Sequence, residues 1–534
     1  MKTFNVTGLC IPDRHYMVNT SDKLEKIMKM VDRGDYFTIN RARQYGKTTT
    51  LFLLKKILNN EYKDEYIVIS ISFEGLGDES FESAAAFCKS FIRLVRRALN
   101  YSSATDDYKE SWANKDVTNF DELSSHITEM SMNKKLVLMI DEVDKSSNNR
   151  TYLHFLGMLR DKYLDRAQDM DHTFHSVILA GVYDIKNIKL KMMAEGVYTP
   201  KATENKLYNS PWNIATDFEV DMSFKPAEIA TMLTEYEADH FTGMDIQLIA
   251  DEIFNYTSGY PFLVSRICQR IDEKVDKDWS LVGVQEAVHI LLREKNTLFD
   301  DMFKNFENNK RLYEFVYDLL LVGSEFRFTI DDPTIELGAM YGFLKANDQD
   351  RVIVANRIFE MRMYNYFISK KATESAGSSE RIIDVLQEDV MDGRRFNMEL
   401  CMRKFAEHFA EIFCERDAKF IEREGRLLFI SYLRPLINGQ GFYHIESQFT
   451  DRRRMDIVVD FGREQFIIEL KLWKGESEHT KAYEQIAGYM RSKGLTEGYL
   501  LTFDFRKSAN KSSYAKWVDF NGVRIYDVVV SAPI

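Results

Sequence analysis

Short apolar runs alternate with longer amphipathic stretches over the first 220 residues of the chain. Stretches with the spacing of amphipathic helices, such as Glu82–Leu99 and Tyr152–Tyr163, separate several of the runs. Strands that alternate with helices usually form a largely parallel sheet covered on both faces. The pattern therefore predicts an α/β domain at residues 1–223, with strands at Tyr36–Asn40, Tyr66–Phe73, Lys135–Ile140, Ser176–Val182 and Phe218–Met222.

The pattern turns helical from Pro226 to about Arg293, where apolar residues recur at the spacing of buried helix faces. We expect a helical lid at residues 224–296. A short pair of strands, Arg327–Ile330 and Arg351–Val354, then lies among further helices. This mixture predicts a small winged-helix unit at residues 297–369.

A polar segment rich in small residues, KKATESAGSSER at residues 370–381, is typical of a linker. We expect a separate domain of mixed α/β structure to follow at residues 382–534. The chain has 534 residues, of which 45% are hydrophobic and 13% aromatic. A chain of this length and hydrophobic content usually forms about two to four domains, each with its own hydrophobic core. A multidomain α/β protein is therefore predicted.

Composition and charge narrow the setting in which the protein works. No apolar run approaches the roughly 20 residues that cross a bilayer, and the N-terminus lacks a signal-peptide core, so we expect a cytoplasmic protein without a membrane partner. The 5 cysteines are widely spaced without a C-x-x-C pair, which argues against disulfides and a zinc ribbon. A net charge of −12 argues against general coating of nucleic acid but allows a local basic groove.

A phosphate-binding loop is predicted at Arg41–Thr50, RARQYGKTTT, between the first strand and a helix. Backbone N–H groups and the dipole at such a helix start both attract an anion. The usual pattern is G-x-x-x-x-G-K-[ST], and Arg41 stands at the first glycine. Gly46 allows close backbone approach, Lys47 can reach the β- and γ-phosphates, and Thr48 can bind Mg²⁺. We therefore expect the chain to bind ATP with Mg²⁺.

Two carboxylates close the continuous apolar run Leu136–Ile140. A buried parallel strand that ends in acid places charge at the carboxyl edge of the sheet, where such folds bind ligands. Asp141 would hold Mg²⁺, directly or through water, and Glu142 would act as general base toward the attacking water. The alternative is a helix start after a strand, where acids accept hydrogen bonds from N–H groups.

Four segments together resemble the AAA-like, STAND-type bacterial ATPases over about the first 370 residues. They are R-x-R-Q-x-G-K-T-T at Arg41–Thr49, the acid pair Asp141–Glu142, SPWNI at Ser210–Ile214 and GYPF at Gly259–Phe262. In that family the loop often begins with R-Q-x-G-K-[ST], so the absent first glycine is tolerated. The resemblance implies nucleotide contacts from Arg43, Gln44 and Thr49. It also places Gly259 and Pro261 near the base, with an ordinary turn as the alternative.

Two further parts of such an ATPase are not located by motifs. Asp184, after the fourth strand, is one candidate for the polar sensor, although a structural turn also explains it. Arg43, Arg150 and Arg160 are each candidates for an arginine finger, an element that would act in a homo-oligomer.

A β-hairpin with its turn at Gly462–Arg463 is predicted in the C-terminal domain. Folding the chain about this turn sets Ile457 opposite Ile468 and Val459 opposite Phe466. One face of the hairpin is then consistently apolar, which favours this register.

The same register sets two carboxylates, Asp456 and Glu469, directly opposite each other. Their Cβ atoms would be about 4.5–5.5 Å apart, and like charges at that separation destabilise a hairpin. Lys471 lies on the same face as Glu469 and compensates one charge. A divalent cation shared by the carboxylates would compensate more, since hard cations prefer oxygen ligands.

This arrangement resembles the PD-(D/E)XK nuclease superfamily, which has an acid on one strand, E-x-K on the next and a helix after them. The resemblance implies that Asp456 and Glu469 bind Mg²⁺ and that Lys471 orients or activates the water that attacks a phosphodiester. Glu424 matches an acid on the first helix of that fold, and Gln485 matches a helix position that often contacts the substrate backbone. The alternative for E-x-K is an ordinary solvated strand face.

Basic residues gather around this hairpin in the sequence: Arg452, Arg453, Arg454, Lys471, Lys474, Lys481, Arg491 and Lys493, followed by Arg506, Lys507, Lys511 and Lys516. Cations beside a metal site would neutralise phosphates, while the alternative is surface solvation. The expected fold is a P-loop NTPase sheet with helical lid and winged helix, followed by a restriction-endonuclease-like domain. We expect an ATPase whose nucleotide state controls Mg²⁺-dependent cleavage of DNA, with RNA as another candidate substrate. The alternative is a STAND-type switch or scaffold whose nuclease-like domain only binds nucleic acid or a protein partner.

Overall fold

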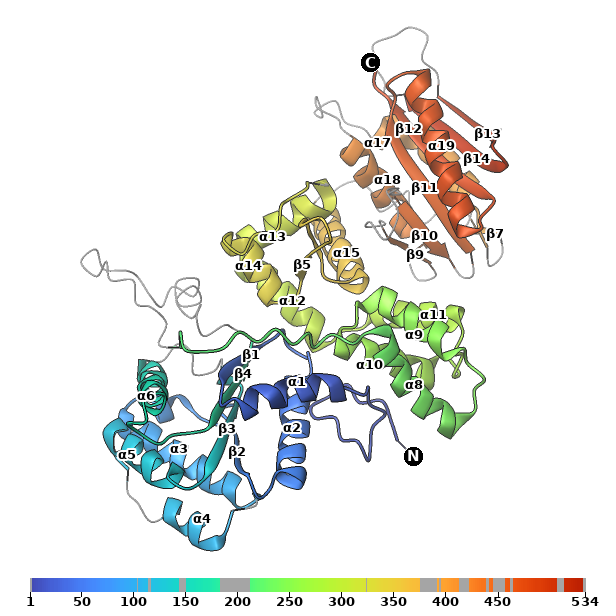
Figure 1. Ribbon diagram of the computed structural model, residues 1–534. Helices are drawn as coiled ribbons and strands as arrows, with labels where there is room; N and C mark the ends of the chain where they lie inside the picture. The colour runs from blue at the N-terminus through green and yellow to red at the C-terminus, as the bar shows by residue number, and fades with distance from the viewer. Residues whose placement is uncertain are drawn as a thin grey trace, which may run out of the picture. The chain divides into compact units, whose positions relative to one another are not determined.

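A computed structural model gives the fold of the chain (Figure 1). It describes residues 2–102, 104–113, 117–143, 150–182, 212–322, 324–374, 391–392, 395–412, 422–437, 441–444, 457–461, 464–506 and 513–531. The first of two compact units comprises Met1–Leu291, Lys295–Met302 and Thr329–Lys345. The second comprises Leu292–Glu294, Phe303–Phe328 and Ala346–Ile534. Within the described ranges, no helix is both long and apolar enough to span a bilayer.

The first unit contains a four-stranded parallel sheet. Its strands are β1 (Tyr36–Asn40), β2 (Tyr66–Ser72), β3 (Lys135–Asp141) and β4 (Ser176–Gly181), in the order β1-β4-β3-β2. Almost every residue of these strands is buried, as expected when both faces of a parallel sheet are covered. Four of the five predicted strands and the parallel arrangement are thereby confirmed.

Helices cover both faces of this sheet (Figure 1). One face packs against α1 (Ser21–Asp32) and α2 (Lys47–Glu61). The other face packs against α3 (Ala84–Leu99), α5 (Phe120–Ser131) and α6 (Arg150–Arg166), with α4 (Asp106–Ala113) and the short helix η1 (Asp78–Phe81) beside them. Each face has its own apolar core because alternate strand residues point to opposite sides.

The prediction that Phe218–Met222 forms a fifth strand is wrong. Before this run, Thr216 makes an isolated parallel bridge with Phe37 of β1, and the described residues after it form no ladder. The Val220 carbonyl instead accepts a hydrogen bond from the Arg41 side chain at 2.8 Å. Val220 and Met222 are buried in the core on the α1 and α2 side of the sheet. An apolar run that packs in this way has the same sequence pattern as a strand, so the sequence does not distinguish the two.

The region predicted to be helical contains α8 (Pro226–His240), α9 (Ile246–Thr257), α10 (Pro261–Lys274) and α11 (Leu281–Arg293). Proline opens α8 and α10, where a missing N–H costs nothing. Leu233 of α8, Ile253 of α9 and Ile267 of α10 are fully buried, and α9 contacts both α8 and α10. Helices α8 to α11 are called the four-helix region below (Figure 1).

Further helices follow: α12 (Thr297–Asn308), α13 (Lys310–Tyr317), η4 (Asp318–Val322), α14 (Pro333–Met340) and α15 (Arg357–Glu374). The predicted pairing of Arg327–Ile330 with Arg351–Val354 is confirmed only as a single antiparallel bridge between Arg327 and Arg351. The regular partner of strand β6 (Val352–Val354) is β5 (Leu344–Ala346), which the sequence did not indicate. Residues 370–374 of the predicted linker continue α15, and residues 375–381 lie outside the described ranges.

The second unit contains a six-stranded mixed sheet in the order β13-β14-β12-β11-β10-β9. The strands are β9 (Gly441–His444), β10 (Ile457–Phe461), β11 (Glu464–Leu472), β12 (Glu497–Asp504), β13 (Tyr514–Phe520) and β14 (Val523–Ser531), with β7 (Met391–Asp392) and β8 (Arg395–Phe396) as a separate pair. In the hairpin of β10 and β11, Ile457 pairs with Ile468 and Val459 with Phe466. The predicted register is confirmed.

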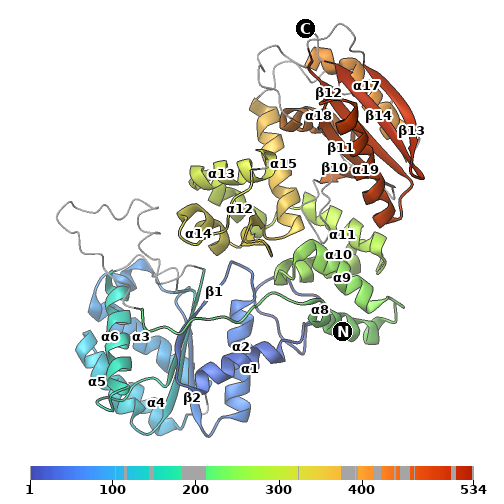
Figure 2. The same ribbon diagram turned by 45° about the horizontal axis from the view of Figure 1, so that its top comes forward.

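Helices also cover both faces of this second sheet (Figure 2). Helix α19 (Glu476–Lys493) packs Ile486 against Leu500 on one face. On the other face, Phe405 of α17 (Met398–Ile412) contacts Phe503, next to α18 (Glu422–Ile437). Side chains of register partners on neighbouring strands point to the same face of a sheet. The residue of β11 that pairs with Leu500 therefore faces α19.

Candidate functional site

The loop between β1 and α2 ends at Gly46, whose backbone has a φ of 81°. This left-handed conformation favours glycine, so the turn itself explains the glycine of the motif. Helix α2 begins at the next residue, and Lys47 Nζ donates to the carbonyls of Arg41 at 2.9 Å and Ala42 at 3.0 Å. Lys47 is 7% exposed. A largely buried cation therefore lies within the loop, where phosphate oxygens could take the place of the two carbonyls.

Strand β3 ends with Asp141 beside the start of α2. The Thr48 hydroxyl donates to Asp141 Oδ2 at 2.7 Å, and the Glu142 N–H donates to Asp141 Oδ1 at 3.0 Å. Asp141 is 8% exposed, so hydrogen bonds hold its carboxylate in largely dry surroundings. Glu142 has a φ of 55°, a costly conformation for a residue other than glycine. Such backbone strain concentrates at functional sites, which makes Glu142 a candidate for one.

The Arg41 side chain explains how the loop closes without the first glycine of the motif. Its guanidinium donates to the carbonyls of Asn40 and Val220, both at 2.8 Å, and lies over the Phe218 ring at 5.4 Å. Burial lowers the pKa of Arg41. The side chain is thus tied to the segment at 218–220, and Lys47 is the cation within the loop. Val220 is too distant in sequence for the motif to indicate this contact.

Arg43 and Gln44, which the resemblance assigns to the nucleotide, contact α12. Arg43 pairs with Asp301 at 2.8 Å, and the Gln44 side-chain amide donates to Thr297 Oγ1 at 2.9 Å. Tyr260, at the start of α10, donates its hydroxyl to the Arg43 carbonyl, and burial raises the pKa of Tyr260 well above its usual value. Sequence reasoning missed Thr297 and Asp301 in this role because single polar residues in helical segments carry no motif. Tyr260 belongs to the GYPF segment, but the resemblance gave it no role.

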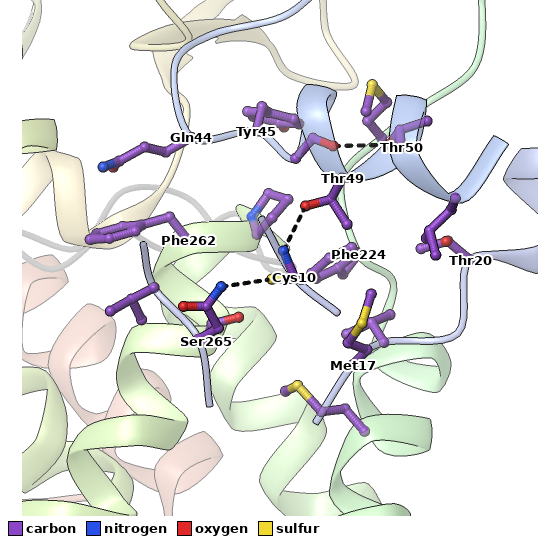
Figure 3. A pocket seen from close by; sticks show the side chains of 18 of the residues that line it. Cys10, Met17, Thr20, Gln44, Tyr45, Thr49, Thr50, Phe224, Phe262 and Ser265 are labelled. Carbon is purple, nitrogen blue, oxygen red and sulfur yellow. Dashed lines mark hydrogen bonds between the residues drawn. The ribbon is translucent and has the colours of Figure 1, made fainter. Parts of the chain in front are cut away.

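A cavity of about 460 Å³ adjoins the loop (Figure 3). Met17, Phe224 and Phe262 give it an apolar side. Its lining includes four residues predicted to bind nucleotide, namely Gln44, Gly46, Thr49 and Pro261. This volume is within the usual range of about 300–1,000 Å³ for small-molecule sites. The fold thus brings together the loop, the four-helix region and an apolar cavity.

The N-terminal segment forms another wall of this cavity, and sequence reasoning missed it entirely. The Cys10 N–H donates to Thr49 Oγ1 at 3.2 Å, and the Asn5 side-chain amide contacts Cys10 Sγ at 3.6 Å (Figure 3). Burial raises the pKa of the Cys10 thiol. The segment is therefore fixed to the first turn of α2, next to the loop.

Gly259 lies at the turn between α9 and α10, with a φ of 72°. A Cβ atom there would meet the Phe224 carbonyl oxygen at 2.0 Å, and the Phe224 N–H donates to the Gly259 carbonyl at 2.8 Å. The close approach of the two backbones explains the glycine structurally and fixes the start of α10, where Pro261 lines the cavity. The predicted position of Gly259 near the base stays a prediction.

Replacing Gly259 by alanine should lower the free energy of unfolding by at least about 2 kcal/mol, because strained backbone and overlap with Phe224 add together. The matched control is Gly243→Ala, since Gly243 has a φ of 75° with no atom within 4 Å of an added Cβ. The control should lose only about 1 kcal/mol. Urea unfolding of both variants checks this, and equal losses would contradict the role of the Phe224 contact.

Of the other predicted parts of this site, only some lie within the described residues. Asp184 and the Ser210–Pro211 pair lie outside the described residues. Among the arginine-finger candidates, Arg43 pairs with Asp301, and Arg160 donates to Asn213 Oδ1 at 2.8 Å. Arg150 is exposed at the first position of α6.

In the second unit, Glu469 and Lys471 lie next to each other on the same face of β11. Lys471 Nζ is 2.5 Å from Glu469 Oε1, and the Glu469 side chain is 1% exposed. Glu469 is the register partner of Leu500, so both charged residues face α19. The alternative for E-x-K was an ordinary solvated strand face. The burial of Glu469 and its ion pair with Lys471 argue against that alternative.

The structure describes only some of the other residues predicted for this second site. Asp456 lies outside the described residues, so its predicted position opposite Glu469 stays a prediction. Glu424 lies in α18, and only its backbone position is described. Gln485 is half-buried on α19.

The basic residues near this site divide into two kinds. Lys481 pairs with Glu478 at 2.6 Å, and Arg506 pairs with Asp504 at 2.7 Å, so acids of the domain already balance these two cations. Lys474 is exposed beside the start of α19. Arg452, Arg453 and Arg454 lie outside the described residues.

The parallel sheet, the left-handed glycine before α2 and the lysine within the loop define a P-loop ATPase fold. Residues 13–288, more than half of the chain, match the family model described as the AAA-like domain. The chain therefore belongs to the AAA-like domain family. No curated protein matches the chain.

Solved structures show weak likenesses. The Walker-type ATPase PABY2304 of Pyrococcus abyssi is 10% identical with a TM-score of 0.44, and the match covers 68% of this chain and 99% of that chain. The Aeropyrum pernix ORC2 protein, in ADPNP–ADP complexes, is 12% identical with a TM-score of 0.34, covering 66% and 93%. Its ADP form is 13% identical with the same TM-score and coverage. The family assignment does not depend on these likenesses.

Proposed function

We propose that the first unit binds ATP with Mg²⁺ at the loop between β1 and α2 and hydrolyses it. The observation that carries this proposal is the 2.7 Å hydrogen bond from Thr48 to Asp141, with Lys47 buried in the loop before them. A hydroxyl, a carboxylate and a lysine at these positions are the groups that P-loop enzymes use on metal and phosphates.

The residues at this point fit a magnesium ion. Thr48 Oγ1 and Asp141 Oδ2 are hard oxygen ligands that already lie together, and an ion bound by both would replace their hydrogen bond while the hydroxyl keeps its proton. When bound, Mg²⁺ would neutralise charge on the transferring phosphate.

The protein groups then divide the work. Lys47 exchanges the Arg41 and Ala42 carbonyls for phosphate oxygens, and N–H groups of the first turn of α2 add hydrogen bonds. Glu142, held in its strained conformation beside Asp141, accepts a proton on its carboxylate from the attacking water. The adjoining cavity holds the base, between Phe224, Phe262 and Pro261.

The Glu142→Gln variant tests hydrolysis separately from binding. We expect it to bind ATP like the parent but to release phosphate about a hundredfold more slowly, since an amide cannot accept the proton. The control is Glu61→Gln, at the exposed far end of α2, which should behave like the parent. ATP titration and phosphate release measure the two properties. Equal and negligible release from parent and Glu142→Gln would instead favour a nucleotide switch that does not turn over.

We further propose that the C-terminal domain cleaves DNA in a Mg²⁺-dependent reaction. The observation that favours it is the ion pair of Lys471 with the buried Glu469, because burial of a charged pair is costly and is common at functional sites. Glu469 would bind the metal with Asp456, and Lys471 would orient the attacking water. Glu424 and Gln485 would support the metal and the substrate backbone.

The alternative is a scaffold whose C-terminal domain binds nucleic acid or a protein partner without cutting it. The pairing of Lys481 and Arg506 with acids favours the protein partner within this alternative, since partly neutralised cations attract phosphates less. Under either proposal, residues 224–296 act as the lid of the ATPase and residues 297–369 as a winged-helix unit.

A further inference from the structure

Helix α12 contacts two loop residues that the family resemblance assigns to the nucleotide. Arg43 pairs with Asp301 at 2.8 Å, and Gln44 donates to Thr297 at 2.9 Å. Both contacts come from the first two turns of α12, although α12 is about 250 positions away in the chain. The phosphate-binding loop is thus connected to an element that no motif links to it.

The partners on α12 are fixed, whereas the Arg43 side chain is exposed. Phe299 and Met302 on α12 are 0% exposed, and the Phe299 N–H donates to Asn296 Oδ1 at 3.0 Å, which caps the helix. The Arg43 side chain is 69% exposed, while its backbone carbonyl is held by Tyr260. Because the backbone of Arg43 is held and its guanidinium is exposed, the guanidinium can leave the Asp301 carboxylate and bind another anion without movement of the loop.

The Arg43–Asp301 pair is weak enough to be exchanged. Exposed ion pairs contribute little to stability, because water screens them and long side chains lose freedom. A triphosphate carries more charge than one carboxylate and offers oxygens that suit the forked geometry of arginine. Phosphates bound at the N-terminus of α2 would therefore compete with Asp301 for Arg43.

We propose that Asp301 is a competitor of the nucleotide phosphates for Arg43, so that α12 loses its ionic contact with the loop when ATP or ADP binds. This inference rests on the proposed ATP site and adds to it a residue that senses occupancy. Asp301 acts through Arg43 and does not itself touch the nucleotide. Release of Asp301 is the signal that α12 receives.

The test is the effect of Asp301→Asn on nucleotide affinity, measured by calorimetric titration with ATP, ADP and AMP. Without the competing carboxylate, ATP and ADP should bind up to about fivefold more tightly, the limit set by a weak exposed pair. AMP lacks the β- and γ-phosphates and should bind the variant and the parent equally. Thermal unfolding of each variant confirms that it is folded.

The matched control is Asp300→Asn, which removes the same charge from the neighbouring, exposed position of α12. It should leave ATP affinity close to that of the parent. In an Arg43→Ala background, Asp301→Asn should produce no gain. Equal gains from Asp300→Asn and Asp301→Asn, or a gain that persists without Arg43, would show a general charge effect and overturn the inference. No gain in ATP affinity from Asp301→Asn also overturns it, while a parent that binds no ATP overturns the ATP site itself.

Discussion

Replacing Lys47 by methionine should lower kcat/KM for ATP hydrolysis by about a thousandfold, because the transferring phosphate loses its buried cation. Lys47 is 7% exposed and bonds to the loop carbonyls at 2.9 and 3.0 Å, so its charge is confined to the loop interior. Methionine has nearly the same length, which keeps the buried position filled. Phosphate release over a range of ATP concentrations gives kcat/KM, and ATP titration measures binding separately.

The control is Lys56→Met, an exposed lysine on the same helix. It removes the same charge from α2 and should leave hydrolysis and binding unchanged. Circular dichroism and thermal unfolding show whether both variants keep the parent fold. Hydrolysis by a folded Lys47→Met protein at the parent rate would place the reaction somewhere other than this loop.

Replacing Lys471 by methionine should lower the rate of DNA cleavage by about a thousandfold, if the C-terminal domain cuts as proposed. Lys471 Nζ lies 2.5 Å from an oxygen of Glu469, whose side chain is 1% exposed, so its charge lies directly against the buried carboxylate. The control is Lys474→Met, which removes an exposed lysine close by in sequence. Conversion of supercoiled plasmid with Mg²⁺, with and without ATP, measures the rate.

Loss of Lys471 also leaves a buried carboxylate without its cation, which costs about 3–5 kcal/mol of stability. The double variant Lys471→Met/Glu469→Gln avoids this cost because both charges are removed together. It should fold like the parent and still fail to cleave. Cleavage by the folded double variant at the parent rate would refute the assignment, and an uncut plasmid with the parent protein would favour the scaffold.

The sequence predicts those features whose signals are local. The apolar runs of β1 to β4 and the opposed apolar residues of β10 and β11 were sufficient for the sheet and the hairpin register. Glu469 and Lys471 were found together because their spacing of two places them on one strand face.

The features that the sequence did not predict are contacts between residues far apart in the chain. Arg41 could be seen as a departure from the glycine pattern, but its acceptor at Val220 could not. The Cys10 and Asp301 contacts near the loop join segments far apart in the chain, and neither residue belongs to a motif. Phe218–Met222 was read as a strand because packing against an edge and pairing along it require the same apolar residues.

The division of α12 between the two compact units limits how the protein can be cut into pieces. Residues up to Met302 belong to one unit and residues from Phe303 to the other, within a single helix of Thr297–Asn308. A helix owes its order to hydrogen bonds between successive turns, so a fragment that begins or ends at this point would fray. Truncated proteins designed to study either proposed activity alone should therefore keep the whole of α12, and chimaeras with other AAA-like proteins should be joined elsewhere.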